Sequence, residues 1–187
     1  TAILSVIKSG EHALFPDSLY GSSRHFVKTL LKDFGVEVEF YPPRTNGRIS
    51  EHFKNNTRLL YLESPGSLTF EVQDVPTMTT LARNRNIVTI CDDTWGTALH
   101  YPVLALGADI VVEAATKYIA GHSDVNLGIA AANGTIGKKL KSTAGALGIC
   151  AGPEDLYLGL RGLRTMRLRL EQSEANGLML AKLLAKH

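Results

Sequence analysis

The chain has few cysteines, few aromatic residues and almost no excess charge. Only two of its 187 residues are cysteine, Cys91 and Cys150, and their wide separation excludes a disulfide framework and a cysteine-based metal site. The 20 basic and 18 acidic residues leave a net charge of +2. No cluster is basic enough for a nucleic-acid partner, and we expect the lysines within 138–141 to form a solvated helix face. A reducing compartment fits such a sequence, so we expect a cytoplasmic location.

Long hydrophobic runs, internal repeats and low-complexity tracts are also absent. No run approaches the length of a membrane span, and residues 1–10 lack the basic start and the cleavage site of a signal peptide. The hydrophobic fraction of 44% is nevertheless enough for a sizeable core, which favours a globular domain. We therefore expect no membrane partner and no nucleic-acid partner.

Apolar, β-branched segments alternate with helical segments along the whole chain. The pattern predicts strands over residues 13–15, 36–41, 57–62, 86–91, 108–112 and 126–132. It predicts helices over residues 22–34, 49–55, 75–84, 136–144 and, broken near Gly162, 153–186. Ser22 or Ser23 is the expected cap of the first of these helices, and Asp74 the cap of the third. This alternation predicts an α/β fold with a mostly parallel sheet, helices on both faces, and residues 126–132 antiparallel at the far side.

Two predicted strands end beside residues that can carry chemistry. The run 86–91 is followed by Asp92 and Asp93, and the run 108–112 leads to Lys117. A right-handed crossover places the carboxyl ends of parallel strands at one edge, where ligands bind in open sheets. We expect Lys117 to be partly desolvated there, so that its amine can form a Schiff base with an aldehyde. An ordinary surface lysine is the alternative.

A lysine opposite a carboxylate is the pair that pyridoxal phosphate needs, because the lysine holds the aldehyde and the carboxylate keeps the ring nitrogen protonated. The sequence resembles the cystathionine-lyase and synthase family of pyridoxal-phosphate enzymes, which act in cysteine and methionine metabolism. Five segments in the correct order carry this resemblance: Asp17-Ser18-Leu19-Tyr20-Gly21-Ser22-Ser23, Leu62-Glu63-Ser64-Pro65-Gly66-Ser67, Cys91-Asp92-Asp93-Thr94-Trp95, residues 114–124, and Leu160-Arg161-Gly162-Leu163-Arg164-Thr165. Together they are far more specific than any one of them.

The resemblance implies a fold-type-I subunit, with a large domain like that of aspartate aminotransferase, truncated here at both ends. Residues 1–165 would form the cofactor-binding large domain, and residues 166–187 would start the helix that connects it to an absent C-terminal small domain. The missing segments would carry the turn that holds the cofactor phosphate, an arm that reaches the neighbouring subunit, and the arginine that binds the substrate carboxylate.

The resemblance also implies roles for individual residues. Lys117 would hold the cofactor and move the substrate α-proton, and Asp92 would contact the ring nitrogen. Tyr20 would stack on the cofactor ring with its hydroxyl near the scissile group, although an ordinary half-buried tyrosine is the alternative. Thr116 would donate its hydroxyl to the phosphate.

Several positions depart from the family pattern or leave alternatives open. Ala114 stands where many relatives have serine, so one phosphate ligand would be absent. Asp93 stands where relatives usually have asparagine, so either acid could meet the ring nitrogen, and we favour Asp92. Ser67 replaces an asparagine, a change that also occurs in bacterial β-lyases, and Glu63 is expected to hold structure at its strand end.

The roles of four neighbouring residues are less specific. Trp95 and Tyr118 either line the pocket or belong to the core. His122 and Asp124 resemble a loop that supports the lysine, and without nearby ligands His122 does not indicate a metal site.

The function implied by the resemblance is a carbon–sulfur β-lyase that cleaves cystathionine to homocysteine, pyruvate and ammonia, in transsulfuration and methionine biosynthesis. Its substrate would be an amino-acid thioether. The alternatives are another member of the family, such as a cystathionine γ-lyase or γ-synthase or a methionine γ-lyase, and a non-catalytic fragment of the fold.

The family also implies a homotetramer built from dimers that share active sites. We expect the apolar residues 2–7 and 144–152 at subunit contacts, unless both segments pack inside their own domain.

Overall fold

The computed structural model describes residues 1–187, which separate into two compact units. The sheet unit comprises residues 1–113 and 130–150. The helical unit comprises residues 114–129 and 151–187. The division into a large domain and a connecting helix at residue 165 stays a prediction.

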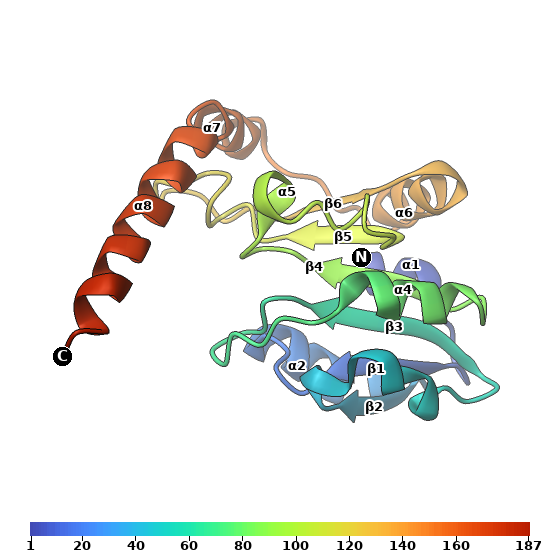
Figure 1. Cartoon of the computed structure of the whole chain (residues 1–187). Helices are drawn as coiled ribbons and strands as arrows, with labels where there is room; N and C mark the ends of the chain where they lie inside the picture. Colours follow the sequence, from blue (N-terminus) through green and yellow to red (C-terminus); the bar gives the residue numbers. More distant parts are fainter. The chain divides into compact units, whose positions relative to one another are not determined.

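The sheet has six strands in the order β2-β1-β3-β4-β5-β6 (Figure 1). The strands are β1 His12–Pro16, β2 Glu37–Tyr41, β3 Thr57–Glu63, β4 Val88–Asp92, β5 Ile110–Glu113 and β6 Ile129–Ala132. Every pairing from β2 to β5 is parallel. All six predicted strands are present, with shifted ends, and the predicted mostly parallel α/β sheet is confirmed. The direction expected for the last strand stays a prediction.

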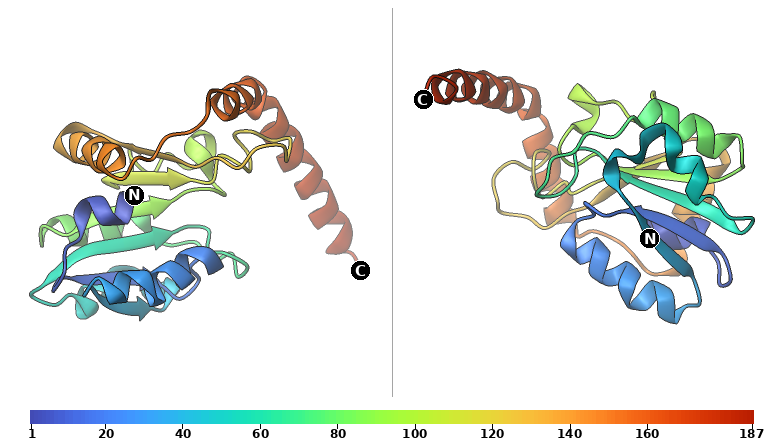
Figure 2. Two further views of the ribbon diagram at one scale, coloured as in Figure 1. Left: turned by 180° about the vertical axis from the view of Figure 1, so that it is seen from behind. Right: turned by 60° about the horizontal axis from the view of Figure 1, so that its bottom comes forward.

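Helices cover both faces of this sheet. One face carries α1 Ala2–Val6, α2 Gly21–Lys28, α3 Leu30–Asp33 and α6 Gly134–Ala146, and the other carries η1 Pro43–His52 and α4 Val75–Arg83. Figure 2 shows α1 and α2 on the face opposite α4. The short helix α5, Thr97–His100, follows β4.

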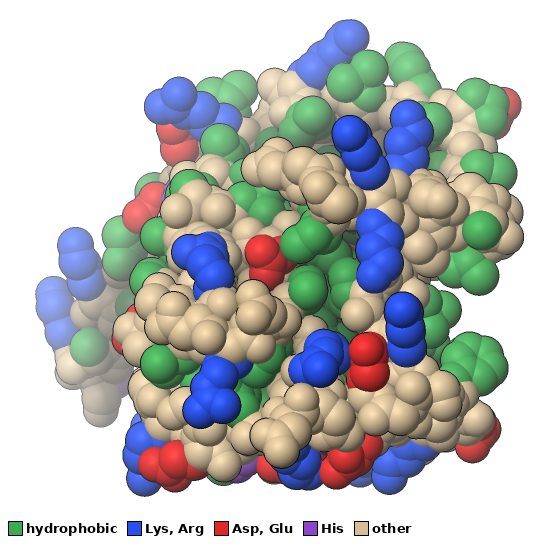
Figure 3. Space-filling view, turned by 90° about the vertical axis from the view of Figure 1, so that its right-hand side faces the viewer, with side chains coloured by type: hydrophobic (Ala, Val, Ile, Leu, Met, Phe, Trp, Pro, Cys, Tyr) green, Lys and Arg blue, Asp and Glu red, His purple; other side chains and the backbone are tan.

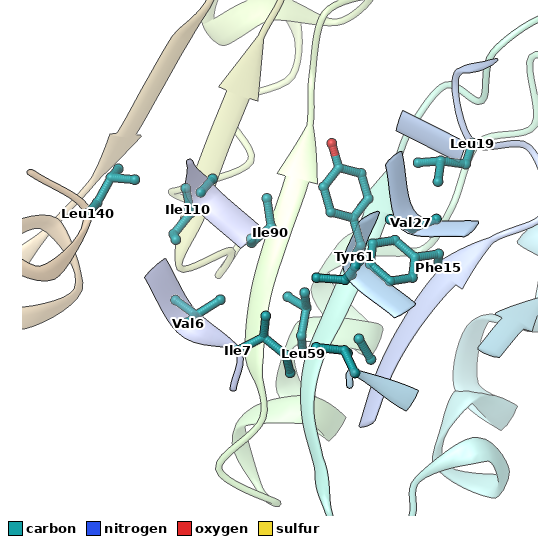
Figure 4. Packing of buried hydrophobic residues seen from close by; sticks show 14 residues of the cluster. Val6, Ile7, Phe15, Leu19, Val27, Leu59, Tyr61, Ile90, Ile110 and Leu140 are labelled. Carbon is teal, nitrogen blue, oxygen red and sulfur yellow. The ribbon is translucent and has the colours of Figure 1, made fainter. Parts of the chain in front are cut away.

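The two buried clusters explain why both faces are covered. Phe15, Tyr61 and Ile90 pack into the cluster beneath α1 and α2, which Figure 4 shows from close by. Their strand neighbours Leu14 and Cys91 pack into the cluster beneath α4. Because successive side chains of a strand point to opposite faces, strands that are apolar throughout need helices on both sides. This confirms the predicted three layers.

The start of the first long helix differs from the prediction. Neither Ser22 nor Ser23 is the cap: α2 begins at Gly21 with Tyr20 at the cap position, and no side chain makes a capping bond. The helix also breaks at Thr29, whose hydroxyl donates to the carbonyl of His25 at 2.7 Å. Such back-bonding competes with the helical backbone and bends it. The cap predicted for α4 is confirmed, since the Asp74 carboxylate accepts from the Thr77 backbone nitrogen at 3.2 Å.

The N-terminal helix bears on one of the expected subunit contacts. Ala2, Val6 and Ile7 are buried in the same cluster as Leu140 of α6, so residues 2–7 pack inside their own unit. This packing supports the alternative given for this helix, and a subunit contact there stays a prediction. The segment 144–152 is different, because Leu147 and Ile149 are 49% and 61% exposed.

The basic residues of α6 behave as predicted. Lys138, Lys139 and Lys141 are exposed, and Leu140 between them is buried. Figure 3 shows this side of the molecule, where basic side chains are spread over the surface with acidic and apolar side chains among them.

The helical unit contains α7 Pro153–Leu163, α8 Met166–Leu184 and the loop that carries Lys117. The two helices meet at residues 164–165, next to the break predicted near Gly162. None of the helices combines the length and apolar character that crossing a membrane would require.

Candidate functional site

Four carboxyl groups gather at the carboxyl edge of the sheet. Glu63, the last residue of β3, is in register with Asp92, the last residue of β4. Asp92 is in register with Val112, and the next residue, Glu113, ends β5. The backbone nitrogen of Asp93 donates to the Val112 carbonyl at 3.0 Å, which holds Asp93 at the same edge. The parallel pairing of β3, β4 and β5 thus brings together acids that are far apart in the sequence.

Asp92 is half-buried and is oriented by Thr94. The Thr94 backbone nitrogen donates to Oδ1 of Asp92 at 3.0 Å, and the Thr94 hydroxyl donates to the same oxygen at 2.6 Å. Burial raises the pKa of Asp92, and the two bonds from Thr94 act against that rise. Sequence reasoning gave Thr94 no role. The Asp-x-Thr spacing could have indicated one, because an aspartate often accepts a bond from the residue two positions on.

Glu63 connects the edge to the segment that carries Tyr20. Its carboxylate accepts a hydrogen bond from the Tyr20 backbone nitrogen at 3.0 Å. Burial raises the pKa of Glu63 to about 7; the bond from Tyr20 lowers it, and the nearby Asp92 charge raises it further. Glu63 thus anchors the start of α2, in agreement with the structural role expected from the sequence.

We predict that Glu63→Gln reduces the pH dependence of stability. The pKa of Glu63 in the folded chain, about 7, lies above its ordinary value of 4.5, so the folded state holds a proton that the unfolded state releases in this window. Stability should therefore fall as the pH rises from about 4.5 to about 7. The substitution should remove part of that fall, by up to about 1.4 kcal/mol per pKa unit.

Urea unfolding at about pH 5 and about pH 7.5 measures this effect. Glu51→Gln at the exposed Glu51 of η1 is the control, and it should leave the slope unchanged. An unaltered slope in Glu63→Gln would contradict the prediction.

Three aromatic side chains near the candidate site residues in sequence or through their contacts are exposed. Tyr20 is 50% exposed, so its ring is open to a ligand. Trp95 is 42% exposed, and its ring meets that of Phe70 edge-on at 5.0 Å. Trp95 is therefore not a core residue, whereas Tyr118 is half-buried. Sequence reasoning missed Phe70, which has a left-handed backbone with a φ of 59° that no local pattern announces.

Lys117 lies in the lysine loop, residues 114–128, which belongs to the helical unit. Its backbone nitrogen donates to the Ala114 carbonyl at 2.9 Å, and its side chain is exposed. The expected desolvation of Lys117 is therefore wrong for this chain. The reason is that β5 ends at Glu113, so the lysine occupies the turn beyond the strand and not the strand end itself.

Thr116 closes the base of the lysine loop. Its backbone nitrogen donates to the Leu127 carbonyl at 2.9 Å, and its hydroxyl accepts from the Leu127 nitrogen at 2.8 Å. The hydroxyl also lies 3.1 Å from the Leu127 carbonyl, to which it can donate. The role of Thr116 in binding a phosphate stays a prediction.

Within the helical unit, α7 and α8 hold the lysine loop. Gly162 of α7 lies so close to it that a Cβ there would overlap the carbonyl oxygens of Ile119 and Ala120. Arg169 of α8 donates to the carbonyls of Ile119 at 3.2 Å and of Gly162 at 2.8 Å. Sequence reasoning did not single out Arg169, which has no distinguishing local pattern.

Two further contacts involve the residues expected to support the lysine. Asp124 forms an ion pair with Arg161 of α7. Nδ1 of His122 lies 2.6 Å from the Ala120 carbonyl, so both side chains are tied within the helical unit.

The predicted site residues thus fall into two groups. Tyr20 and Asp92 lie in the sheet unit, and Thr116 and Lys117 lie in the helical unit. Their chemistry fits pyridoxal phosphate: an exposed amine, a carboxylate oriented by two hydrogen bonds, and an open aromatic ring. The pairing of Lys117 with Asp92 across one cofactor stays a prediction.

Comparison with known proteins shows the family of the chain. All 187 residues match the model of the Cys/Met metabolism PLP-dependent enzymes. The chain belongs to this family. Its members depend on pyridoxal phosphate, and the resemblance seen in the sequence is confirmed.

Individual relatives carry different activities. The chain is 46% identical over 179 residues to a Rhizobium johnstonii protein provisionally named a cystathionine β-lyase, covering 96% of the chain and 45% of that protein. It is 38% identical over 186 residues to an L-alanine/L-glutamate racemase of Wolbachia pipientis, covering 100% of the chain and 46% of the racemase. The crystal structure of a cystathionine γ-lyase from Lactobacillus plantarum, complexed with L-serine, matches with a TM-score of 0.94 at 26% identity, covering 100% of the chain and 49% of the lyase. The chain therefore spans about half the length of these proteins.

Proposed function

We propose that the whole protein is a pyridoxal-phosphate-dependent carbon–sulfur β-lyase of the cytoplasm, which cleaves cystathionine to homocysteine, pyruvate and ammonia. The observation that carries the proposal is the Asp92 carboxylate, fixed by two hydrogen bonds from Thr94 at the sheet edge, in a chain whose family depends on this cofactor. The 46% identity to the Rhizobium johnstonii protein favours β-elimination among the activities of the family.

Asp92, not Asp93, is the residue that suits the cofactor ring nitrogen. Asp92 is half-buried with its carboxylate held in one orientation, whereas the side chain of Asp93 is closed off from any ligand, with 1% exposure. Bound pyridoxal phosphate supplies a ring that accepts the electrons left behind when a bond to the substrate α-carbon breaks. Asp92 would strengthen that acceptance by holding a proton on the ring nitrogen.

Lys117 and Tyr20 would handle the substrate. The exposed amine of Lys117 would hold the cofactor and, once released, take the α-proton as a general base. The open ring of Tyr20 would stack on the cofactor, with its hydroxyl directed to the leaving sulfur. Glu63 fixes the backbone of Tyr20, and Thr116 would bind the phosphate.

We expect the whole protein to form a homotetramer of dimers that share active sites. The exposed Leu147 and Ile149 of the segment 144–152 support a contact at that segment. Light scattering of the whole protein tests this, and a fully active monomer would exclude shared sites.

Two observations favour other reactions on the same residues. The structural match to a γ-lyase favours elimination one carbon further along the substrate, and the relative that is a racemase favours return of a proton to the opposite face of the α-carbon. Both begin with the proton transfer assigned to Lys117, so the fate of the substrate, not the site, distinguishes them.

The decisive experiment incubates the whole protein with pyridoxal phosphate and cystathionine and identifies the products. Homocysteine with pyruvate supports the β-lyase; cysteine with 2-oxobutyrate indicates a γ-lyase; racemised L-alanine, added separately, indicates the racemase. Borohydride reduction followed by peptide mass analysis should find the cofactor on Lys117. A label on another lysine, such as the exposed Lys138, would contradict the assignment, and no label with no product would favour a non-catalytic fold.

A further inference from the structure

The side chain of Asp93 is sealed in the sheet unit without a partner. It is 1% exposed, and neither of its carboxylate oxygens has a hydrogen-bond partner. An ionised carboxylate in this setting would lose its hydration and gain nothing in return, so burial favours the protonated acid. Its neighbour Asp92 differs on both counts, being half-buried and bonded to Thr94.

The turn after β4 closes around Asp93. The backbone nitrogen of Thr97 donates to the Asp93 carbonyl at 2.8 Å. A Cβ on Gly96 would overlap Oδ1 of Asp93 and would lie 2.6 Å from the Cβ of Tyr101. Gly96 is therefore required for the turn to pack directly against the carboxyl group.

The titratable groups whose charges shift the pKa of Asp93 are all acids. The carboxylates of Glu113 on β5 and Asp92 on β4 both disfavour its charge, and it acts in turn on the Cys91 thiol and the Tyr101 phenol. No lysine, arginine or histidine is among them. Burial first, then Glu113 and Asp92, raise the pKa of Asp93 to about 8.

We propose that Asp93 is a positioning residue that works as a neutral carboxylic acid. By keeping its proton it leaves Asp92 as the single negative charge at the end of β4. An ionised Asp93 would place a second carboxylate beside Asp92, and the repulsion would push a proton onto Asp92 or displace it from Thr94. The part concerning Asp92 rests on the proposed function, whereas the neutral state of Asp93 is a property of the chain alone.

The proposal predicts a loss of stability as the pH rises from about 4 to about 8. The pKa of Asp93 in the folded chain, about 8, lies above its ordinary value of 3.8, so stability is greatest at low pH within this window and is lost as the pH rises to about 8. Asp93→Asn keeps the size and the neutrality of the acid and should remove this loss.

Infrared spectroscopy of the chain without cofactor tests the neutral state directly. A protonated-carboxyl band should be present at about pH 7, weaker in Asp93→Asn because only the contribution of Glu63 remains, and lost from the unsubstituted chain as the pH passes about 8. Glu63→Gln is the control that removes the other acid with a strongly raised pKa. Carbon-13 NMR of labelled aspartates reports the same protonation without any substitution, in case the variant does not fold. Full ionisation of Asp93 at about pH 7 would overturn the proposal.

The pH profile of the whole protein tests the link to Asp92. Asp93→Asn should keep the activity at neutral pH and extend it to higher pH. An unchanged alkaline limb in Asp93→Asn would refute the positioning role. If the whole protein proves inactive, the infrared result still decides whether Asp93 is neutral.

Discussion

Asp92→Asn in the whole protein is expected to retain pyridoxal phosphate but to turn over about 10²- to 10⁴-fold more slowly. This is the range typical of removing a positioned acid or base. Asparagine preserves the shape of the side chain and can still accept the two bonds from Thr94. It cannot keep a proton on the ring nitrogen by its charge, so the cofactor would bind but would accept electrons poorly. Absorption of the bound cofactor and steady-state turnover measure the two effects separately.

The matched controls are at the neighbouring positions. Asp93→Asn changes the adjacent acid and should have a much milder effect at neutral pH. Thr94→Val removes only the hydroxyl bond to Asp92, so its loss of turnover should lie between those of Asp92→Asn and Asp93→Asn. Near-normal turnover of Asp92→Asn would exclude Asp92 from the ring nitrogen.

Gly162→Ala is expected to destabilise the helical unit by about 1–3 kcal/mol, the usual cost of overpacking. Its new methyl group would overlap the carbonyl oxygens of Ile119 and Ala120, and backbone atoms cannot swing away as a flexible side chain can. Either α7 or the lysine loop must move, which would also loosen the bonds from Arg169. Urea unfolding and faster hydrogen exchange over residues 116–121 would report the change.

The chain offers a control for the same substitution. Gly177 lies inside α8 with open space where a Cβ would be, so Gly177→Ala should stabilise its helix by about 0.5–1 kcal/mol through propensity alone. If both alanine variants stabilise the chain equally, the close approach of Gly162 to the loop is refuted.

The acidic edge could be predicted from the sequence to a large extent. The run 86–91 is mostly apolar and β-branched, without alternation of polar and apolar residues, which favours cover on both faces and hence a parallel sheet with helices on each side. Parallel connection then places Asp92 at the common edge, where the structure has it beside Glu63. Periodicity and connectivity are general constraints on the chain, so they can be read without coordinates.

The burial of particular side chains could not be predicted in the same way. Residues 2–7 and 144–152 are both apolar, yet the first segment lies in the core and the second exposes Leu147 and Ile149. Lys117 follows a buried strand and is still exposed, because a few residues of turn are enough to leave the packed layer. These outcomes depend on tertiary packing, which local sequence does not contain.

The closed base of the lysine loop has a mechanical consequence. Thr116 and Leu127 are joined by bonds in both directions, so residues 117–126 form a loop whose two ends are tied together. These two hydrogen bonds therefore already bear most of the entropic cost of closing the loop. Disorder in the distal part of the loop need not extend to Lys117, which is next to Thr116. The backbone of Lys117 would therefore stay in place after a protease cut near His122, because Thr116 would still be bonded to Leu127. Loss of the bonds between Thr116 and Leu127 would instead make Lys117 mobile.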